Sequence, residues 1–300
     1  MEEKQKMELE ALNVQAEEKS SFDFAAIYTT LVLNWKWFVL SLIICLGAAA
    51  IYLRYKTPIY QASAKLLIKD NDQSGRGNSS MLNSATLGLI SNSNGIDNEM
   101  EILTSHSLAQ QAVRDLKLYT NYYQVGKVKD ILLYGNQPIS VDLDPAHLEK
   151  LNAPISLEIE CLGNGYHVTG TYYVPLDENR ADGPYTIDKQ LTTLPATIGI
   201  KAGILSFSTN VVTPMAEGAR LKVFIQSPKN ASYKYVGALS VSQTAKTTTI
   251  AQLVLSDESP QRSVDYLKQL AICYNRQANA DKNEIAVRTE EFINGRLEKI

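Results

Sequence analysis

The sequence has few of the residues that build catalytic and metal centres. Three cysteines and three histidines occur among its 300 residues, and His106, His147 and His167 have no Cys or His partner at metal-ligand spacing. No Gly-x-Ser-x-Gly segment is present, and no nucleophile stands beside an obvious base. We therefore expect no catalytic residue, no metal and no cofactor in this chain.

Basic clusters and phosphate-binding loops are also missing. The net charge is -3, and the Lys and Arg residues form no stripe, which excludes a nucleic-acid partner. The lone Gly126-Lys127 pair lacks the upstream glycine and the following hydroxyl of a Gly-x-x-x-x-Gly-Lys-[Ser/Thr] loop. ATP and Mg are therefore not expected to bind within residues 1–300.

The remaining chemistry-bearing residues have ordinary interpretations. Cys161 and Cys273 can form at most one disulfide, and small buried hydrophobes are the simpler expectation. Glu99 and Glu101 resemble a carboxylate pair, but the spacing of two residues points them apart on a helix. Tyrosines that can either stack on sugar rings or fill a core lie at Tyr119, Tyr122, Tyr123, Tyr172 and Tyr173.

One long charge-free run stands out against this background. Residues 37–53, from Trp37 to Leu53, contain no charged side chain and approach the roughly 20 apolar residues that a membrane-spanning helix needs. Both ends carry residues typical of the membrane–water interface, namely Trp35, Lys36, Tyr52, Arg54, Tyr55 and Lys56. We therefore predict a transmembrane helix over 37–53, which makes the membrane itself a partner.

Two alternatives to a permanent anchor remain open here. A buried core helix has a similar composition, and residues 48–50 resemble the small-residue site of a cleaved signal peptide. The leader, residues 1–36, is rich in glutamate rather than short and basic, which favours the anchor. Charge does not settle the orientation, since slightly more Lys and Arg residues follow the run than precede it.

The flanking segments differ in pattern. Residues 1–36 are interpreted as a polar tail followed by an interfacial helix over 22–33. After Pro58, residues 60–69 alternate between apolar or small and polar, which predicts a strand with one buried face. Residues 70–95 are crowded with Asn, Ser and Gly and predict a long loop.

Helices and a β-rich insert follow. We predict a helix over 97–103 and a second helix capped by Ser105. Short β-rich runs separated by turn residues then predict an antiparallel β module, residues 137–230, inserted into an α/β domain made of 54–136 and 231–280. The runs lie at residues 155–161, 166–174, 204–212 and 221–226.

A strand at 248–255 is expected to pair with 60–68. Next, Asp257-Glu258-Ser259-Pro260 provides a cap and a proline at the first helical position. The apolar stripe continues to the last residue, so 281–300 is predicted to be the start of a long, truncated coiled-coil-type helix. The fold class predicted is an α+β membrane protein with a transmembrane helix, a mixed α/β domain and an inserted antiparallel β module.

Four stretches, read in order, resemble the Wzz-type chain-length determinant, or polysaccharide co-polymerase, family. They are Asp23 with Trp37; residues 58–68 with Pro58, Tyr60, Ala62 and Ala64; residues 98–105 with Glu99, Glu101, Leu103 and Ser105; and residues 281–298 with Phe292 and Leu297. The ordered set is more specific than any single stretch. The β-rich insert is similar to that of longer members in which a cytoplasmic tyrosine autokinase follows a second spanning helix.

The resemblance implies a bacterial inner-membrane protein with its N-terminus in the cytoplasm and residues 54–300 in the periplasm. Its implied role is an oligomeric scaffold, a homo-oligomer ring, that regulates the chain length or export of capsular or exopolysaccharide. The implied partners are the polysaccharide polymerase and export machinery and the glycan. The sequence has no second spanning helix and no kinase motif, so kinase activity, with its ATP and Mg, would belong to a missing downstream part.

The alternative function is a periplasmic membrane-fusion-type adaptor of an export system, in which one anchor precedes β-rich modules and a helical hairpin. It explains the anchor, the insert and the long helix, but not a strand directly after the anchor. An enzyme acting on glycans is a third and weaker interpretation.

Overall fold

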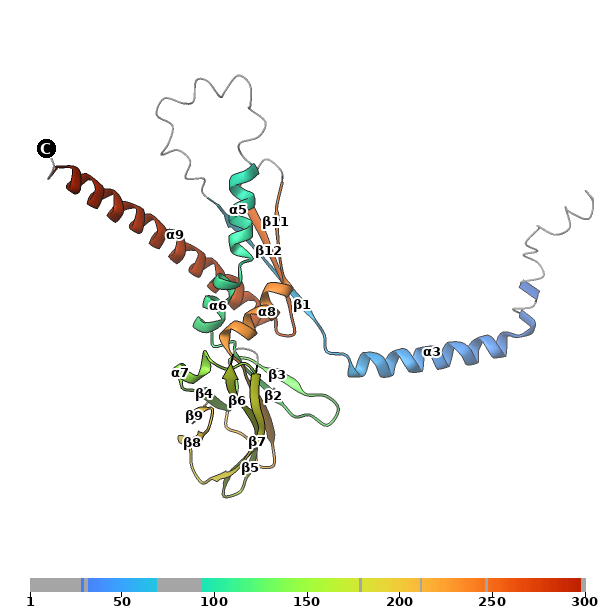
Figure 1. Cartoon of the computed structure of the whole chain (residues 1–300). Coiled ribbons are helices and arrows are strands. Elements are labelled where there is room, and N and C mark those ends of the chain that lie inside the picture. The colour runs from blue at the N-terminus through green and yellow to red at the C-terminus, as the bar shows by residue number, and fades with distance from the viewer. Residues whose placement is uncertain are drawn as a thin grey trace, which may run out of the picture. The chain divides into compact units, whose positions relative to one another are not determined.

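A computed structural model describes residues 28–29, 32–68, 93–177, 180–210, 212–245 and 248–297. The chain splits into two units, residues 1–56 and 57–300, and each is described by itself (Figure 1). The predicted polar tail, Asp23, most of the predicted interfacial helix and most of the predicted loop lie outside the described residues.

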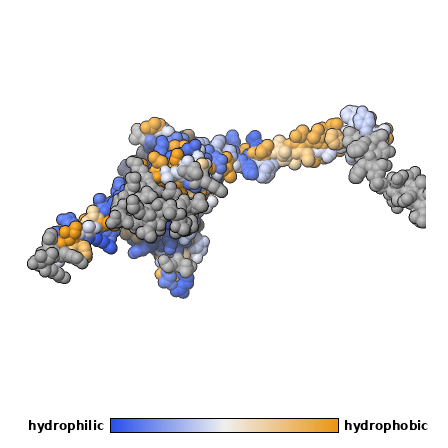
Figure 2. Space-filling view, turned by 90° about the horizontal axis from the view of Figure 1, so that it is seen from above, coloured by the Kyte–Doolittle hydropathy of each residue, from blue (hydrophilic) through white to orange (hydrophobic). Residues whose placement is uncertain are grey.

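The first unit contains helix α3 (Trp35–Tyr55), which includes the whole predicted run. Among the described helices it is the one that is long and apolar enough to cross a membrane, with a mean hydropathy of 2.0. Figure 2 shows its surface as a mostly apolar, orange band. Within its own unit, α3 has no buried residue.

The second unit begins with a three-stranded antiparallel sheet in the order β1-β12-β11. The strands are β1 (Tyr60–Leu67), β12 (Ile250–Asp257) and β11 (Leu239–Gln243). Tyr60 lies opposite Asp257 and Leu67 opposite Ile250. This register confirms that the strand after Pro58 pairs with the strand before the long helix; β11 was not expected.

Four helices pack on this sheet or on one another: α5 (Ser93–Leu103), α6 (His106–Asp115), α8 (Pro228–Ala238) and α9 (Pro260–Leu297). The Ser105 hydroxyl accepts a hydrogen bond from the Leu108 amide at 3.3 Å, so the predicted cap of α6 is confirmed. Helix α8 was missed, although Ser227 and Pro228 carry a cap-and-proline signature. Helix α5 begins at residue 93, inside the stretch predicted to be a loop.

The β-rich residues form two antiparallel sheets, a six-stranded one in the order β3-β2-β10-β5-β6-β7 and a three-stranded one in the order β4-β9-β8. The elements are β2 (Thr120–Gln124), β3 (Ile131–Leu133), β4 (Ile139–Leu143), α7 (Pro145–Leu148), β5 (Ile155–Leu162), β6 (Gly165–Asp177), β7 (Arg180–Leu191), β8 (Ala196–Ile200), β9 (Gly203–Thr209) and β10 (Arg220–Ile225).

All four predicted β-rich runs are strands, namely β5, β6, β9 and β10. Strands β2 and β3 precede residue 137, where the sequence placed the start of the insert, yet both belong to the six-stranded sheet. We therefore use the name β module for β2 to β10 with α7.

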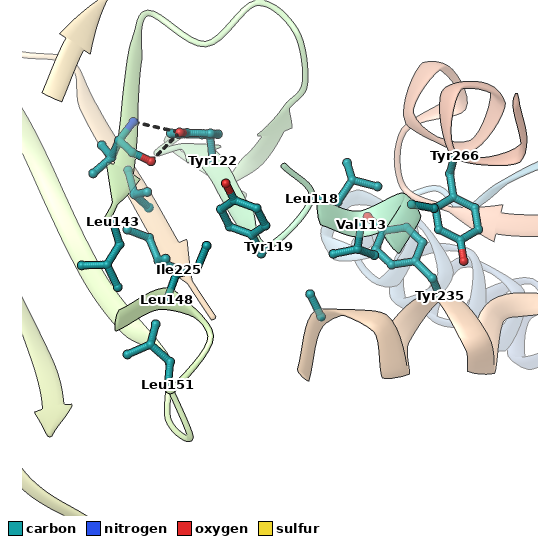
Figure 3. Close-up of a cluster of buried hydrophobic side chains, with 14 of the residues drawn as sticks. Val113, Leu118, Tyr119, Tyr122, Leu143, Leu148, Leu151, Ile225, Tyr235 and Tyr266 are labelled. Carbon is teal, nitrogen blue, oxygen red and sulfur yellow. Dashed lines mark hydrogen bonds between the residues drawn. The ribbon is translucent and has the colours of Figure 1, made fainter. Parts of the chain in front are cut away.

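The β module shares one hydrophobic core with the helices. Figure 3 shows Tyr122, Leu143 and Ile225 on the β side and Tyr235 and Tyr266 on the helical side. The chain crosses between the two sides just after α6, where Lys117, two residues beyond the last helical residue, has the left-handed conformation with φ of 53°. The β module is thus packed on the helices and not merely tethered to them.

Candidate functional site

The family-like stretches meet around the three-stranded sheet. We call the group of β1, β12, β11, α5, α6 and α9 the strand–helix frame. Ala62 and Ala64 lie half-buried on the same sheet face as Leu253 and Leu255, and α9 packs against β1 and β12. Small side chains in β1 allow close approach of a helix. Pro58 precedes the strand and is exposed.

Helix α5 is fastened to α9 by one polar contact and one apolar anchor. The Tyr274 hydroxyl donates a hydrogen bond to Glu99 Oε2 at 2.7 Å. Burial, followed by the Glu99 carboxylate, raises the pKa of Tyr274, so the phenol stays protonated as a donor. Leu103 is fully buried at the end of α5. Glu101 is exposed, so Glu99 and Glu101 do not act as a pair.

Helix α6 is fastened to α9 through Asp115. The Asp115 carboxylate accepts a hydrogen bond from Gln269 Nε2 at 2.7 Å and lies 3.1 Å from Arg276 Nη2. The same carboxylate lies 3.6 Å from the thiol of Cys273, and burial, then Asp115, raises the pKa of that thiol. Cys273 is a buried free thiol and Cys161 a partly exposed one.

A buried ion pair joins β12 to α9. Asp257 ends β12, Arg262 lies in the first turns of α9, and their residues are 4% and 2% exposed. Arg262 Nη2 donates to Asp257 Oδ1 at 2.6 Å, and Arg262 Nε donates to Asp257 Oδ2. The sequence placed a helix cap within residues 257–260, and the structure confirms it at Ser259, whose hydroxyl accepts from the Arg262 amide at 3.3 Å.

The ion pair reaches the β module as well. Arg262 Nη1 donates to the side-chain oxygen of Asn121 on β2 at 2.9 Å. Lys234 Nζ of α8 lies 3.3 Å from Asp257 Oδ1. Burial raises the pKa of Asp257, but the hydrogen bonds and charge of Arg262, with the charge of Lys234, outweigh it and hold the pKa below 3.8. Sequence reasoning missed this network because its members lie far apart in the chain.

Two stacked tyrosines lie beside the network. The rings of Tyr235 on α8 and Tyr266 on α9 are 4.6 Å apart at their centroids with an interplanar angle of 16° (Figure 3). Both hydroxyls are buried and have no hydrogen-bond partner among the described residues. Burial is the first cause that raises the pKa of each phenol.

The second half of α9 is exposed. Every residue from 279 to 295 is exposed, including the apolar Ile285, Val287, Phe292 and Ile293. Leu297 is the last helical residue described. The coiled-coil seam predicted for this part of the helix stays a prediction.

Most tyrosines considered for sugar stacking are core residues. Tyr119, Tyr122 and Tyr172 are buried, so the stacking hypothesis is wrong for their ring faces. Tyr123 packs edge-on against Phe224 with ring centroids 5.8 Å apart. Tyr173 is only partly buried.

The described part of the chain has no group of three or more His, Cys, Asp or Glu residues that could hold a metal ion. His147 pairs with Asp144 at 2.6 Å and His167 with Asp188 at 2.8 Å, at separate places on the β module. The hydrogen bond from His147 is the first cause that lowers the pKa of Asp144. These contacts have structural roles within the β module.

Comparison with known protein families gives one match. Residues 20–116 match the sequence model of the Wzz family, described as chain length determinant protein, which confirms the resemblance over about a third of the chain. The match includes α3 and three elements of the frame, β1, α5 and α6. No curated protein matches the chain.

Proposed function

We propose that this protein is a subunit of a bacterial inner-membrane polysaccharide co-polymerase that regulates the chain length or export of a capsular or exopolysaccharide. The observation that carries the proposal is the Wzz match over 20–116, because its strand and helices assemble with the distant helix α9 into one frame. No catalytic residue is part of the proposal. The frame would act by holding subunits in a fixed arrangement.

In this proposal α3 spans the inner membrane, residues before it are cytoplasmic and residues 54–300 are periplasmic. Exposed aromatic residues at both ends of α3, Trp37 and Tyr52, support it. With native cysteines replaced, Ser63→Cys should react with an impermeant maleimide in intact spheroplasts, whereas Glu10→Cys should react only after lysis. The reverse labelling refutes the topology. An intact mass that lacks the residues up to about position 50, the small-residue site, refutes the anchor and supports a cleaved signal peptide.

The proposal includes a homo-oligomer ring, in which the exposed half of α9 contributes to contacts between subunits. Ile285 and Phe292 are seven residues apart, so they lie on nearly the same side of the helix. Ile285→Glu should lower the oligomer mass of the detergent-solubilised full-length protein in native mass spectrometry. Asn283→Glu is the matched control, since it adds the same charge on the other side of the helix. A strictly monomeric wild-type protein contradicts the ring.

The functional test is complementation. In a strain that lacks the gene, the wild-type protein should restore the length distribution of the polysaccharide on gels, and Ile285→Glu should shift it while Asn283→Glu does not. An unchanged length distribution on deletion of the gene would refute the proposed role.

A link to a tyrosine autokinase is the finer part of the proposal, and it rests on the resemblance of the β-rich residues 137–230 to the insert of kinase-linked members. A reading frame past codon 300 that encodes a second apolar segment and a Walker-type loop would support it, with ATP and Mg bound there. A return through β-rich segments would favour the membrane-fusion-type adaptor instead.

A further inference from the structure

A cavity of about 460 Å³ lies where the β module meets the end of α6. It is bounded by β2, β4, β9 and the connection between β3 and β4. Its volume lies within the range of small-molecule sites. The family-like residues of the frame do not line it, so neither the family match nor the proposed scaffold assigns it a role.

Two residues of its lining carry buried polar atoms without partners. Thr120 Oγ1 and Gln137 Oε1 make no hydrogen bond within the described chain, and Thr120 is only 8% exposed. Leaving such an atom unpaired costs on the order of 1–3 kcal/mol. A smaller cavity of about 210 Å³, beside Gln124 and Met215, has no such atom in its lining. The larger cavity is therefore the one that offers unused hydrogen-bonding capacity.

Both atoms belong to residues that line the cavity, and each atom has almost no accessible surface of its own. A ligand can pair with them if the Thr120 hydroxyl rotates about χ1 or the Gln137 amide rotates about its last torsion. Both rotations are changes between side-chain rotamers and require little energy. The Thr120 hydroxyl can donate a hydrogen bond, and the Gln137 amide oxygen can accept one. A complementary ligand therefore carries hydroxyl groups, because a hydroxyl can both accept and donate.

The charges at the cavity cancel. Lys117 Nζ lies 3.0 Å from both carboxylate oxygens of Asp142, and no other charged residue belongs to the lining. Because the cation and the anion already satisfy one another, neither a phosphate nor an ammonium group finds an unpaired counter-charge here. A neutral ligand fits this electrostatic balance.

Aromatic rings supply the apolar part of the wall. The Tyr122 hydroxyl is fully used, since it accepts from the Val141 amide at 2.9 Å and donates to the Val141 carbonyl at 3.2 Å (Figure 3). The ring of Tyr122, held in place by these two hydrogen bonds, is therefore a rigid apolar part of the cavity lining. Burial, followed by Asp265, raises the pKa of Tyr134 to about 12, so this second phenol adds no charge.

We propose that this cavity binds a neutral hexopyranose unit, with sugar hydroxyls paired to Thr120 and Gln137 and sugar C–H groups against the partly exposed Tyr134. Sugars combine apolar C–H faces with many hydroxyls and no charge, as this lining requires. That the sugar belongs to the polysaccharide rests on the proposed function; the binding itself does not.

The test is saturation-transfer NMR on the full-length protein in a detergent without a sugar headgroup. The probes are glucose, galactose, mannose and N-acetylglucosamine, with glucuronate as a charged comparator and glycerol as a small one. At least one neutral hexose should bind, with a Kd in the millimolar range. Thr120→Val should weaken it roughly three- to tenfold while the Tm stays equal or rises, because the unpaired hydroxyl is replaced by a methyl group of the same shape.

Thr171→Val is the matched control, since Thr171 lies exposed on β6 of the same sheet and outside the cavity. Ser208→Trp fills the cavity from an exposed position and should abolish binding. Binding by no neutral hexose, equal binding of glycerol or glucuronate, or unchanged binding in both cavity variants overturns the proposal.

The outcomes separate the two proposals. If the gene deletion changes polysaccharide length but Thr120→Val and Ser208→Trp change neither hexose binding nor length, the cavity proposal fails and the scaffold stands. If hexose binding follows the variants but the deletion leaves the polysaccharide unchanged, the cavity binds sugar and the proposed function fails.

Discussion

Replacement of Arg262 by Met is the sharpest test of how the frame is held together. The variant removes the cation that pairs with Asp257, and breaking a buried ion pair from one side costs about 3–5 kcal/mol. Lys234 remains 3.3 Å from Asp257 with its side chain 44% exposed, so part of the charge stays compensated. We therefore expect a loss near the lower limit, about 3 kcal/mol.

For a unit of this size, such a loss lowers the Tm by about 6–12 °C. The assay is thermal unfolding of the detergent-solubilised full-length protein, followed by the near-UV circular dichroism of tyrosine. Tryptophan fluorescence is unsuitable, because both tryptophans, Trp35 and Trp37, lie in α3. The stacked Tyr235 and Tyr266, next to the ion pair, are a local reporter.

Arg114→Met is the matched control. Its ion pair with Glu149 has a similar distance, 2.8 Å, but the two side chains are 47% and 41% exposed, so the loss should be about 0–1 kcal/mol. The double variant Asp257→Leu/Arg262→Met should recover most of the lost stability, because no unpaired buried charge remains. Equal Tm values for Arg262→Met and Arg114→Met, or no recovery in the double variant, would refute the reasoning.

Three further outcomes follow from the same frame. Because Arg262 holds the pKa of Asp257 below its usual value, this contribution to stability is complete above the unfolded pKa of about 3.9 and is lost as pH falls through the folded pKa. The difference in Tm between wild type and Arg262→Met should therefore shrink below about pH 4, and a constant difference would contradict it. Leu103→Ala leaves a cavity at a fully buried position and should lower the free energy of unfolding, measured in urea, by about 2–5 kcal/mol. The control Ile102→Ala, at an exposed position, should lower it by less than about 0.5 kcal/mol, and equal losses would contradict the burial of Leu103. Tyr274→Phe removes the hydrogen bond to Glu99 and should cost about 0.5–1.5 kcal/mol, with faster amide exchange in α5; unchanged exchange there would show that the bond does not fasten this helix.

Local patterns predicted the elements that carry strong local signals. Alternation in residues 60–68 and the cap-and-proline pattern before Pro260 are properties of neighbouring residues, and β1 and the start of α9 lie where these signals placed them. The structure also confirms the pairing of β1 with β12 that was expected to bring the long helix back beside the first strand.

Features that depend on contacts between distant residues were not predictable in this way. Strand β11 is a short run of alternating Ser and apolar residues that becomes a strand only because β12 lies beside it. Strand β3 has three residues and exists as a partner of β2. Arg262 looks like a polar position on a helix, and only the fold shows that it is buried between Asp257 and Asn121.

The ion pair explains how the β module can keep a fixed orientation on the frame. The β module is joined to the frame through residues 116–119 after α6 and to α8, which precedes β11 of the frame, through residues 226–227. Two covalent connections with apolar packing still allow the β module to rotate slightly. The guanidinium of Arg262 has planar donors in a fixed fork, two on Asp257 of the frame and one on Asn121 of the β module. A methionine at position 262 would fill a similar volume, but it has no hydrogen-bond donors to fix the orientation of its neighbours. The buried charges therefore contribute orientation more than stability, which the proposed scaffold would require if it works by geometry.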